Sequence, residues 1–139
     1  MDIEYKKVDL PLTDEVLALL NTTESDQARI RKAWTLGEHF FAFDGEKIIG
    51  AAVVNTNESV AELTNIAVEQ GYQCKGVARK LIEKIKGFAL TLGKSQLKVD
   101  TDRTSAHQFE FYQKWGFRPY QEACSSDEQQ PNRVMIIDL

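Results

Sequence analysis

The chain has 139 residues, of which 42% are hydrophobic and 27% are charged. This length suits one domain with a substantial core, and the composition excludes disordered, collagen-like and membrane-embedded chains. With 17 basic and 21 acidic residues, the formal net charge is −4, which argues against a generally basic nucleic-acid binder. We therefore expect one domain over residues 1–139 that binds neither nucleic acid nor a membrane.

The chain contains two cysteines, Cys74 and Cys124. Two cysteines are too few for a disulfide framework, and they lack the spacing and the partners of a zinc site. The N-terminal residues carry no apolar signal core. We therefore expect a cytoplasmic protein without a metal site.

The first half of the sequence predicts two helices and four strands. Thr13 is placed to cap a helix, Thr23 with Asp26 resembles a capping box, and Asp44-Gly45 is a hairpin signal. The predicted elements are a strand at Ile3–Val8, helices over Thr13–Leu20 and after Asp26, and strands at Phe40–Phe43, Lys47–Asn55 and Ser59–Val68. Imperfect alternation in the last of these strands suits a β-bulge.

The second half begins with an amphipathic helix that ends at Gly93. Its apolar residues Val77, Leu81, Ile85, Phe88 and Leu92 follow one another at helical steps. The later predicted elements are a strand at Ser95–Thr101, a helix capped by Thr104 or Ser105 and ended by Gly116, and strands at Phe117–Cys124 and Arg133–Leu139. The order predicts an α/β (α+β) fold with a mixed sheet of about seven strands and four helices on both faces.

The most informative segment is a strand, a glycine-containing loop and a helix between Ile66 and Leu81. Unpaired amides and a partial positive charge make a helix N-terminus suitable for binding phosphate. From Gln70 to Lys86 there are five basic residues and one acidic residue, a local charge of +4 that leaves −8 for the remainder. This favours an anion site, although lysines on a solvated helix face give the same pattern. The glycine spacing fits neither a Walker-type loop nor a dinucleotide fingerprint.

Two motifs resemble those of a known family. Gln73-Cys74-Lys75-Gly76-Val77-Ala78 resembles the Gln/Arg-x-x-Gly-x-Gly/Ala signature of the GNAT superfamily of acyl-CoA-dependent N-acetyltransferases. Phe111-Tyr112-Gln113-Lys114-Trp115-Gly116-Phe117 looks like the Phe-Tyr-x-Lys-x-Gly-Phe segment of that family. The resemblance implies a single GNAT-like domain that transfers an acetyl group directly from acetyl-CoA to the amine of a small molecule or protein.

The resemblance also implies a set of cofactor contacts. The backbone amides from Cys74 to Arg79 would hold the pyrophosphate, and the backbone at Ile66 and Val68 would pair with the pantetheine arm where two strands splay apart. The full set is Ile66, Ala67, Val68, Gln73, Cys74, Lys75, Gly76, Val77, Ala78, Arg79, Ser105 and Tyr112. Ser105 and Gln108 stand where the family often has Asn and Ala. Ser105 can still cap the helix and donate one hydrogen bond.

Two residues are candidates for the chemistry. Tyr112 matches the general-acid tyrosine of the family, with an aromatic core patch as the alternative interpretation. Glu62 lies on the strand that leads into the cofactor loop and is the candidate base, with an ordinary solvent-facing residue as the alternative. Asp100 and Asp102 are alternative bases, or they hold a cationic acceptor.

Trp34 is a candidate for the wall of the acceptor pocket, with a core position as the alternative interpretation, and the overall acidity favours a cationic amine. Cys74 has no His–acid pair near it in the sequence, so we do not predict a nucleophile there; His39 and His107 are expected to be structural or surface residues. The competing hypotheses are a noncatalytic acyl-CoA-binding module and a nucleotide-binding regulator. A homodimer formed through Phe117–Leu139 is a further expectation.

Overall fold

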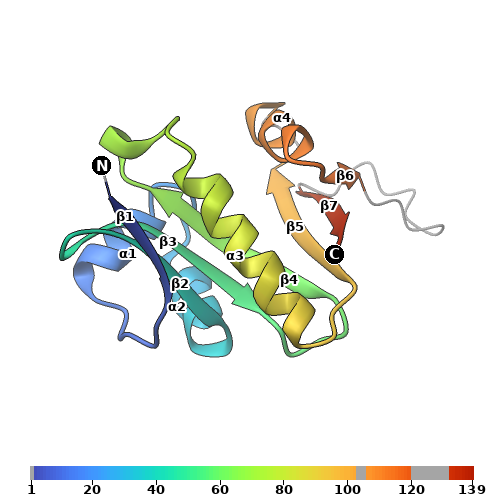
Figure 1. The fold of residues 1–139 in the computed structure, drawn as a ribbon, viewed down its shortest axis with the longest axis horizontal. Coiled ribbons are helices and arrows are strands. Elements are labelled where there is room, and N and C mark those ends of the chain that lie inside the picture. The colour runs from blue at the N-terminus through green and yellow to red at the C-terminus, as the bar shows by residue number, and fades with distance from the viewer. Residues whose placement is uncertain (1, 103–105, 120–131) are drawn as a thin grey trace.

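The computed structural model describes residues 2–102, 106–119 and 132–139, with side chains over 2–99, 110–119 and 134–139. Figure 1 shows the arrangement of the elements. In chain order they are β1 (Ile3–Lys7), α1 (Asp14–Leu20), α2 (Gln27–Leu36), β2 (Glu38–Asp44), β3 (Lys47–Asn55), β4 (Ala61–Val68), the 3₁₀ turn η1 (Gln70–Tyr72), α3 (Val77–Thr91), β5 (Gln96–Asp102), α4 (Ala106–Lys114), β6 (Arg118–Pro119) and β7 (Asn132–Asp138).

The described residues form one sheet of seven strands in the order β1-β2-β3-β4-β5-β7-β6. The β4–β5 pair is parallel and the other neighbouring pairs are antiparallel. The predicted mixed sheet with four helices is therefore confirmed. Gly45, at φ 63°, forms the hairpin turn between β2 and β3 as predicted.

Helices cover both faces of the sheet, and each face has its own apolar cluster. Leu81 and Ile85 of α3 lie in one cluster, and Ile30 and Trp34 of α2 lie in the other. Figure 1 shows α3 crossing the front of the sheet, with α1 and α2 behind it. Gly50 of β3 lets α3 approach closely, because a Cβ there would lie 3.3 Å from side-chain atoms of Leu81 and Val77.

Strand β4 is only partly paired with β5. The parallel pairing joins Ala61–Leu63 with Leu97–Val99, whereas β4 continues to Val68. Over its last five residues β4 therefore pairs with β3 alone among the described strands. The two strands separate as the family resemblance implied.

A β-bulge in β4 lies where this separation begins. Val53 of β3 faces Asn65 and Val54 faces Leu63, so Thr64 is the extra residue. Its hydroxyl donates a hydrogen bond to the Val53 carbonyl at 3.0 Å. The predicted bulge is thus confirmed and located.

The bulge changes the faces of the sheet on which the later β4 side chains lie. Leu63 belongs to the cluster under α3, whereas Ala67 belongs to the cluster under α1 and α2. Since side chains alternate along a strand, Glu62 and Asn65 both face the α1–α2 side.

The start of α2 differs from the predicted capping box. Asp26 caps the helix by accepting from the amides of Ala28 and Arg29 at 3.0 and 3.4 Å. The Thr23 hydroxyl instead lies 3.0 Å from both the Ile66 carbonyl and the Asn65 side-chain oxygen, so it connects the α1–α2 loop to β4.

The predicted strand Phe117–Cys124 is described only over β6, and its remainder lies outside the described residues. Within the part of the chain that the structure describes, no helix is long and apolar enough to cross a membrane.

Candidate active site

The free edge of β4 presents backbone groups to the gap beside β5. The amide of Glu69 donates to the Ile49 carbonyl at 2.8 Å and therefore points toward β3. Because backbone groups alternate in direction along a strand, those of Ile66 and Val68 point away from β3. The Val68 carbonyl accepts from the Gln73 side-chain amide at 3.0 Å. The N–H groups of Ile66 and Val68 therefore point toward the gap beside β5.

The N-terminus of α3 is open. Gly76 is its N-cap residue at φ 82°, and no side chain among the described residues caps the helix. A Cβ at Gly76 would meet nothing within 4 Å, and Cys74, at φ 63°, is also exposed. Unpaired amides therefore face free space at the positive end of the helix dipole.

The Tyr72 side chain fixes the loop before α3 to the β2–β3 hairpin. The Tyr72 hydroxyl donates to Asp44 at 2.5 Å, and this hydrogen bond raises the pKa of Tyr72. The ammonium groups of Lys47 and Lys75 lie 5.8 and 6.0 Å from the centre of the Tyr72 ring. Sequence reasoning missed this anchor, since nothing local links residues 28 positions apart.

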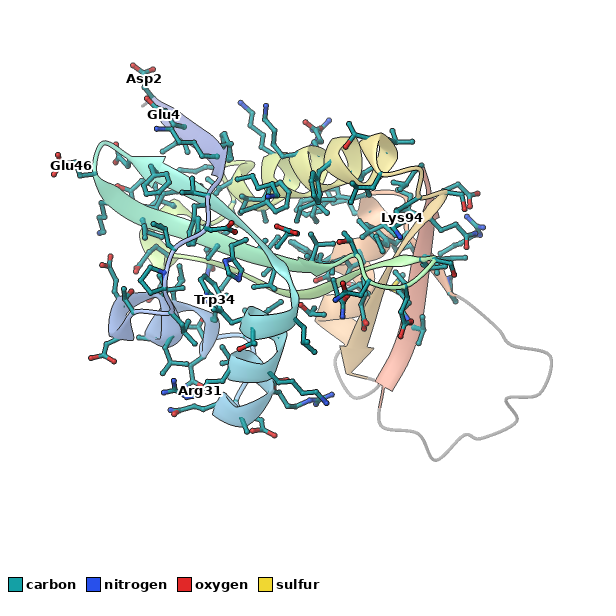
Figure 2. All side chains as sticks on the ribbon, turned by 90° about the horizontal axis from the view of Figure 1, so that it is seen from below. Asp2, Glu4, Arg31, Trp34, Glu46 and Lys94 are labelled. Carbon is teal, nitrogen blue, oxygen red and sulfur yellow. The ribbon has the colours of Figure 1, made fainter. Side chains whose placement is uncertain are left out.

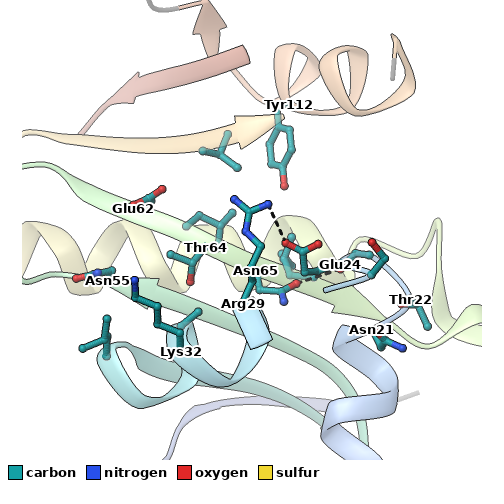
Figure 3. A pocket seen from close by; sticks show the side chains of 17 residues that line it. Asn21, Thr22, Glu24, Arg29, Lys32, Asn55, Glu62, Thr64, Asn65 and Tyr112 are labelled. Carbon is teal, nitrogen blue, oxygen red and sulfur yellow. Dashed lines mark hydrogen bonds and ion pairs between the residues drawn. The ribbon is translucent and has the colours of Figure 1, made fainter. Parts of the chain in front are cut away.

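A cleft of about 720 Å³ lies between α2, β4 and α4. Figure 3 shows its side chains. The lining comprises the α1–α2 loop (Asn21, Thr22, Thr23, Glu24, Ser25), α2 (Arg29, Lys32, Ala33, Leu36), β3 (Asn55), β4 (Glu62, Leu63, Thr64, Asn65, Ile66), β5 (Val99) and α4 (Tyr112). The cleft therefore includes the place where β4 and β5 separate.

Tyr112 has its ring in the core and its hydroxyl in the cleft. Its ring makes edge contacts with Phe111 and Phe117 at centroid distances of 5.0 and 5.4 Å, and the residue is 8% exposed. Figure 3 shows the hydroxyl pointing into the cleft from α4. Burial raises the pKa of Tyr112 well above its ordinary value, so the phenol keeps its proton at neutral pH. The core and acid interpretations are thus compatible.

Glu62 is half-buried in the wall of the same cleft, on the part of β4 that still pairs with β5. It lies opposite Asn55 of β3, which also lines the cleft. Asn65, 8% exposed, follows on the same face of β4. The cleft therefore combines a carboxylate, amides and a phenol.

The sequence over residues 12–117 matches the acetyltransferase (GNAT) family. The chain belongs to this family. The chain is also 29% identical over 121 residues to an uncharacterized N-acetyltransferase, YvbK, of Bacillus subtilis, with 85% of this chain and 78% of that protein covered.

Solved structures share the fold of this acetyltransferase family member. A Bacillus subtilis acetyltransferase in complex with coenzyme A has a TM-score of 0.82 at 25% identity, covering 99% of both chains. An IAA acetyltransferase from Bacillus cereus has a TM-score of 0.81 at 24% identity, covering 99% of this chain and 100% of that one. Coenzyme A is thus bound by a relative with the same architecture.

Several predicted site residues of this GNAT protein lie away from the cleft or outside the described part of the structure. Trp34 lies in the core between α2 and the sheet (Figure 2), stacked on His39 at 3.7 Å, and it is not among the residues that line the cleft. Asp100 and Asp102 are on β5, but their side chains lie outside the described part of the structure, as does all of Ser105.

His39 is buried, with Nε2 2.7 Å from the Trp34 carbonyl, in agreement with a structural role. Among the described residues, no group of three or more His, Cys, Asp or Glu side chains is arranged to hold a metal ion. Arg29 and Lys32, which line the cleft, gave no sequence signal, because charged residues are typical of the outer face of an amphipathic helix.

Proposed function

We propose that this protein is a single-domain N-acetyltransferase that moves an acetyl group from acetyl-CoA to a primary amine by direct transfer in a ternary complex. The observation that carries the proposal is one cleft that joins the free edge of β4 to the hydroxyl of Tyr112. Acceptor and donor would meet there, where β4 and β5 separate.

The described residues fit coenzyme A at two places. The amides from Cys74 to Arg79, at the uncapped start of α3, would hold the pyrophosphate. The N–H groups of Ile66 and Val68 would bind the pantetheine arm as an added strand, and the Gln73 side chain would release the Val68 carbonyl for the same purpose. Acetyl-CoA supplies the acetyl group as a reactive thioester.

The residues of the cleft supply the proton transfers. An alkyl amine with a pKa of about 10.4 is mostly protonated at pH 7 and must lose a proton before it can attack. Glu62, directly or through water, would accept that proton, with Asp100 and Asp102 as the alternative bases. A backbone N–H near Val68 would stabilise negative charge on the acetyl oxygen, and Tyr112 would protonate the departing sulfur.

Thiol release from acetyl-CoA with a library of amines tests the activity. We expect release with at least one amine, and Tyr112→Phe should lower kcat about 100-fold with little change in acetyl-CoA affinity. Because the pKa of Tyr112 is raised, the acid stays protonated and kcat should show no loss attributable to it up to about pH 10. Near-normal kcat in Tyr112→Phe would exclude its acid role, and acetyl-CoA binding without release would favour the noncatalytic module.

The base is tested by Glu62→Gln. A base must be deprotonated to act, so kcat/KM of the native protein should fall at low pH, and the variant should lose both rate and this acidic limb. Glu46→Gln, in the exposed hairpin turn, is the matched control. If Glu62→Gln kept both the native rate and the fall of kcat/KM at low pH, the general base would be assigned to Asp100 or Asp102 instead.

A further inference from the structure

Helix α2 presents two cations to the cleft. Arg29 and Lys32 are three residues apart, which places them on one face of the helix, and both line the cleft. Figure 3 shows both side chains reaching from α2 toward β4 and α4. The opposite face of α2 is the core face, with Ile30 and Trp34 buried. The packing of α2 therefore directs these two charges at the cleft.

The two cations differ in their partners. Arg29 lies 3.6 Å from the Glu24 carboxylate, at the edge of the same cleft. For Lys32, no carboxylate of the described residues lies within ion-pair distance. The α2 side of the cleft thus carries a positive charge that no carboxylate of the described residues pairs with.

The opposite wall of the cleft is formed by β4. Glu62 is the carboxylate on β4, and Asn65 and Thr64 add polar groups beside it. An acceptor whose ammonium approaches Glu62 would direct its remaining atoms toward α2. A second ammonium at that end would be repelled by Lys32, whereas an anionic group would be attracted.

We propose that the acceptor is a primary amine that also carries an anionic group, a carboxylate or a phosphate, bound by Lys32 with Arg29 beside it. The inference rests on the proposed transferase function and specifies its substrate class. It narrows the cationic amine that the net acidity of the chain favoured, because the charges inside the cleft, rather than the total charge, meet the substrate.

Three amines with the same six-carbon chain test the proposal. 6-Aminohexanoate, hexylamine and 1,6-diaminohexane offer the same reacting amine with an anionic, a neutral or a cationic far end. We expect kcat/KM from thiol release to be about fivefold higher for 6-aminohexanoate than for hexylamine, and lowest for the diamine. Comparison of 4-aminobutanoate with 3-aminopropylphosphonate then distinguishes a carboxylate from a phosphate.

Variants on α2 assign the effect to Lys32. Lys32→Gln should bring 6-aminohexanoate to the level of hexylamine, and Lys32→Glu should make the diamine the better substrate. Arg31→Gln is the control, because Arg31 is exposed on the same helix, does not line the cleft and points away from the sheet in Figure 2. An equal preference in native protein and Lys32→Glu would overturn the proposal.

Binding measured without turnover separates the two claims. The Kd of each six-carbon amine is obtained by NMR titration of the protein, with and without coenzyme A. Tighter binding of 6-aminohexanoate supports the anion preference even if no amine is acetylated, in which case the transferase function alone fails. Equal binding of all three amines, including no binding, overturns the inference.

Discussion

The N-termini of α2 and α3 are the same structural feature treated in opposite ways. Asp26 caps α2 with its own carboxylate, which accepts two backbone amides. Gly76 begins α3 with a positive φ, and no side chain in the described part of the chain caps this helix. One helix satisfies its terminal donors from within the chain, and the other leaves them exposed.

Under the proposed function, the open start of α3 is where a little stability is given up for binding. A side-chain cap contributes about 1 kcal/mol relative to alanine but only roughly a few tenths relative to glycine, so the glycine start of α3 sacrifices little stability. The capped start of α2 and the glycine start of α3 therefore make separable predictions, one on stability and one on affinity.

The largest expected effect comes from adding a carboxylate at Gly76. Gly76→Asp would place a negative charge beside the proposed pyrophosphate site, and we expect acetyl-CoA affinity to fall about 30-fold, or about 2 kcal/mol. Isothermal titration calorimetry measures the change. Gly76→Asn, with the same shape and tolerance of positive φ but no charge, should lose only a few-fold. Unchanged affinity in Gly76→Asp would contradict an anion site at α3.

Removing the cap of α2 should have the reverse signature. Asp26→Ala is expected to lower the free energy of unfolding by about 1 kcal/mol, measured by urea denaturation, while the acetyl-CoA Kd stays within about twofold. Asp26→Ser keeps a capping oxygen and should restore most of the stability. If Asp26→Ala weakened acetyl-CoA binding as much as Gly76→Asp does, the two helix ends would not be independent.

The smallest effect is expected within α3 itself. Gly87 is an exposed helical glycine at which a Cβ would meet nothing within 4 Å, and its φ is not positive. Gly87→Ala should raise the free energy of unfolding by about 0.5–1 kcal/mol without altering acetyl-CoA affinity. A thermal melt checks the gain. No gain in stability would contradict the inference that nothing at position 87 requires a glycine.

The sequence predicted those features that local chemistry determines. The apolar spacing of α3 and its end at Gly93 were predicted correctly, and Gly93 has a φ of 79° with its amide bonded to the Leu90 carbonyl. The cap of α1 by Thr13 is confirmed by its hydrogen bond to the Val16 amide at 3.3 Å. The family and the fold followed from the two motifs together with the order of elements.

Predictions from the sequence were wrong where a contact with a residue distant in the sequence determines the structure. Thr23 and Asp26 both have capping side chains, and the assignment depends on a hydrogen bond from Thr23 to Ile66, 43 residues away. Trp34 could equally face the core or the cleft until the packing of α2 against the sheet is known. The proposed roles of Glu62 and Tyr112 stay predictions, because catalysis depends on substrate positions that neither spacing nor packing specifies.

The bulge at Thr64 reverses the alternation of side chains between the two faces of β4. A strict period of two carried across it would place Ile66 and Val68 on the wrong side of the sheet. A bulge also bends its strand, and this one coincides with the end of the β4–β5 pairing. Deletion of Thr64 would remove the bend, and all the remaining β4 side chains would keep the faces of the sheet that they now occupy. Circular dichroism of the deletion variant would show whether the fold is retained. Calorimetry with acetyl-CoA would show separately whether the gap between β4 and β5 has closed.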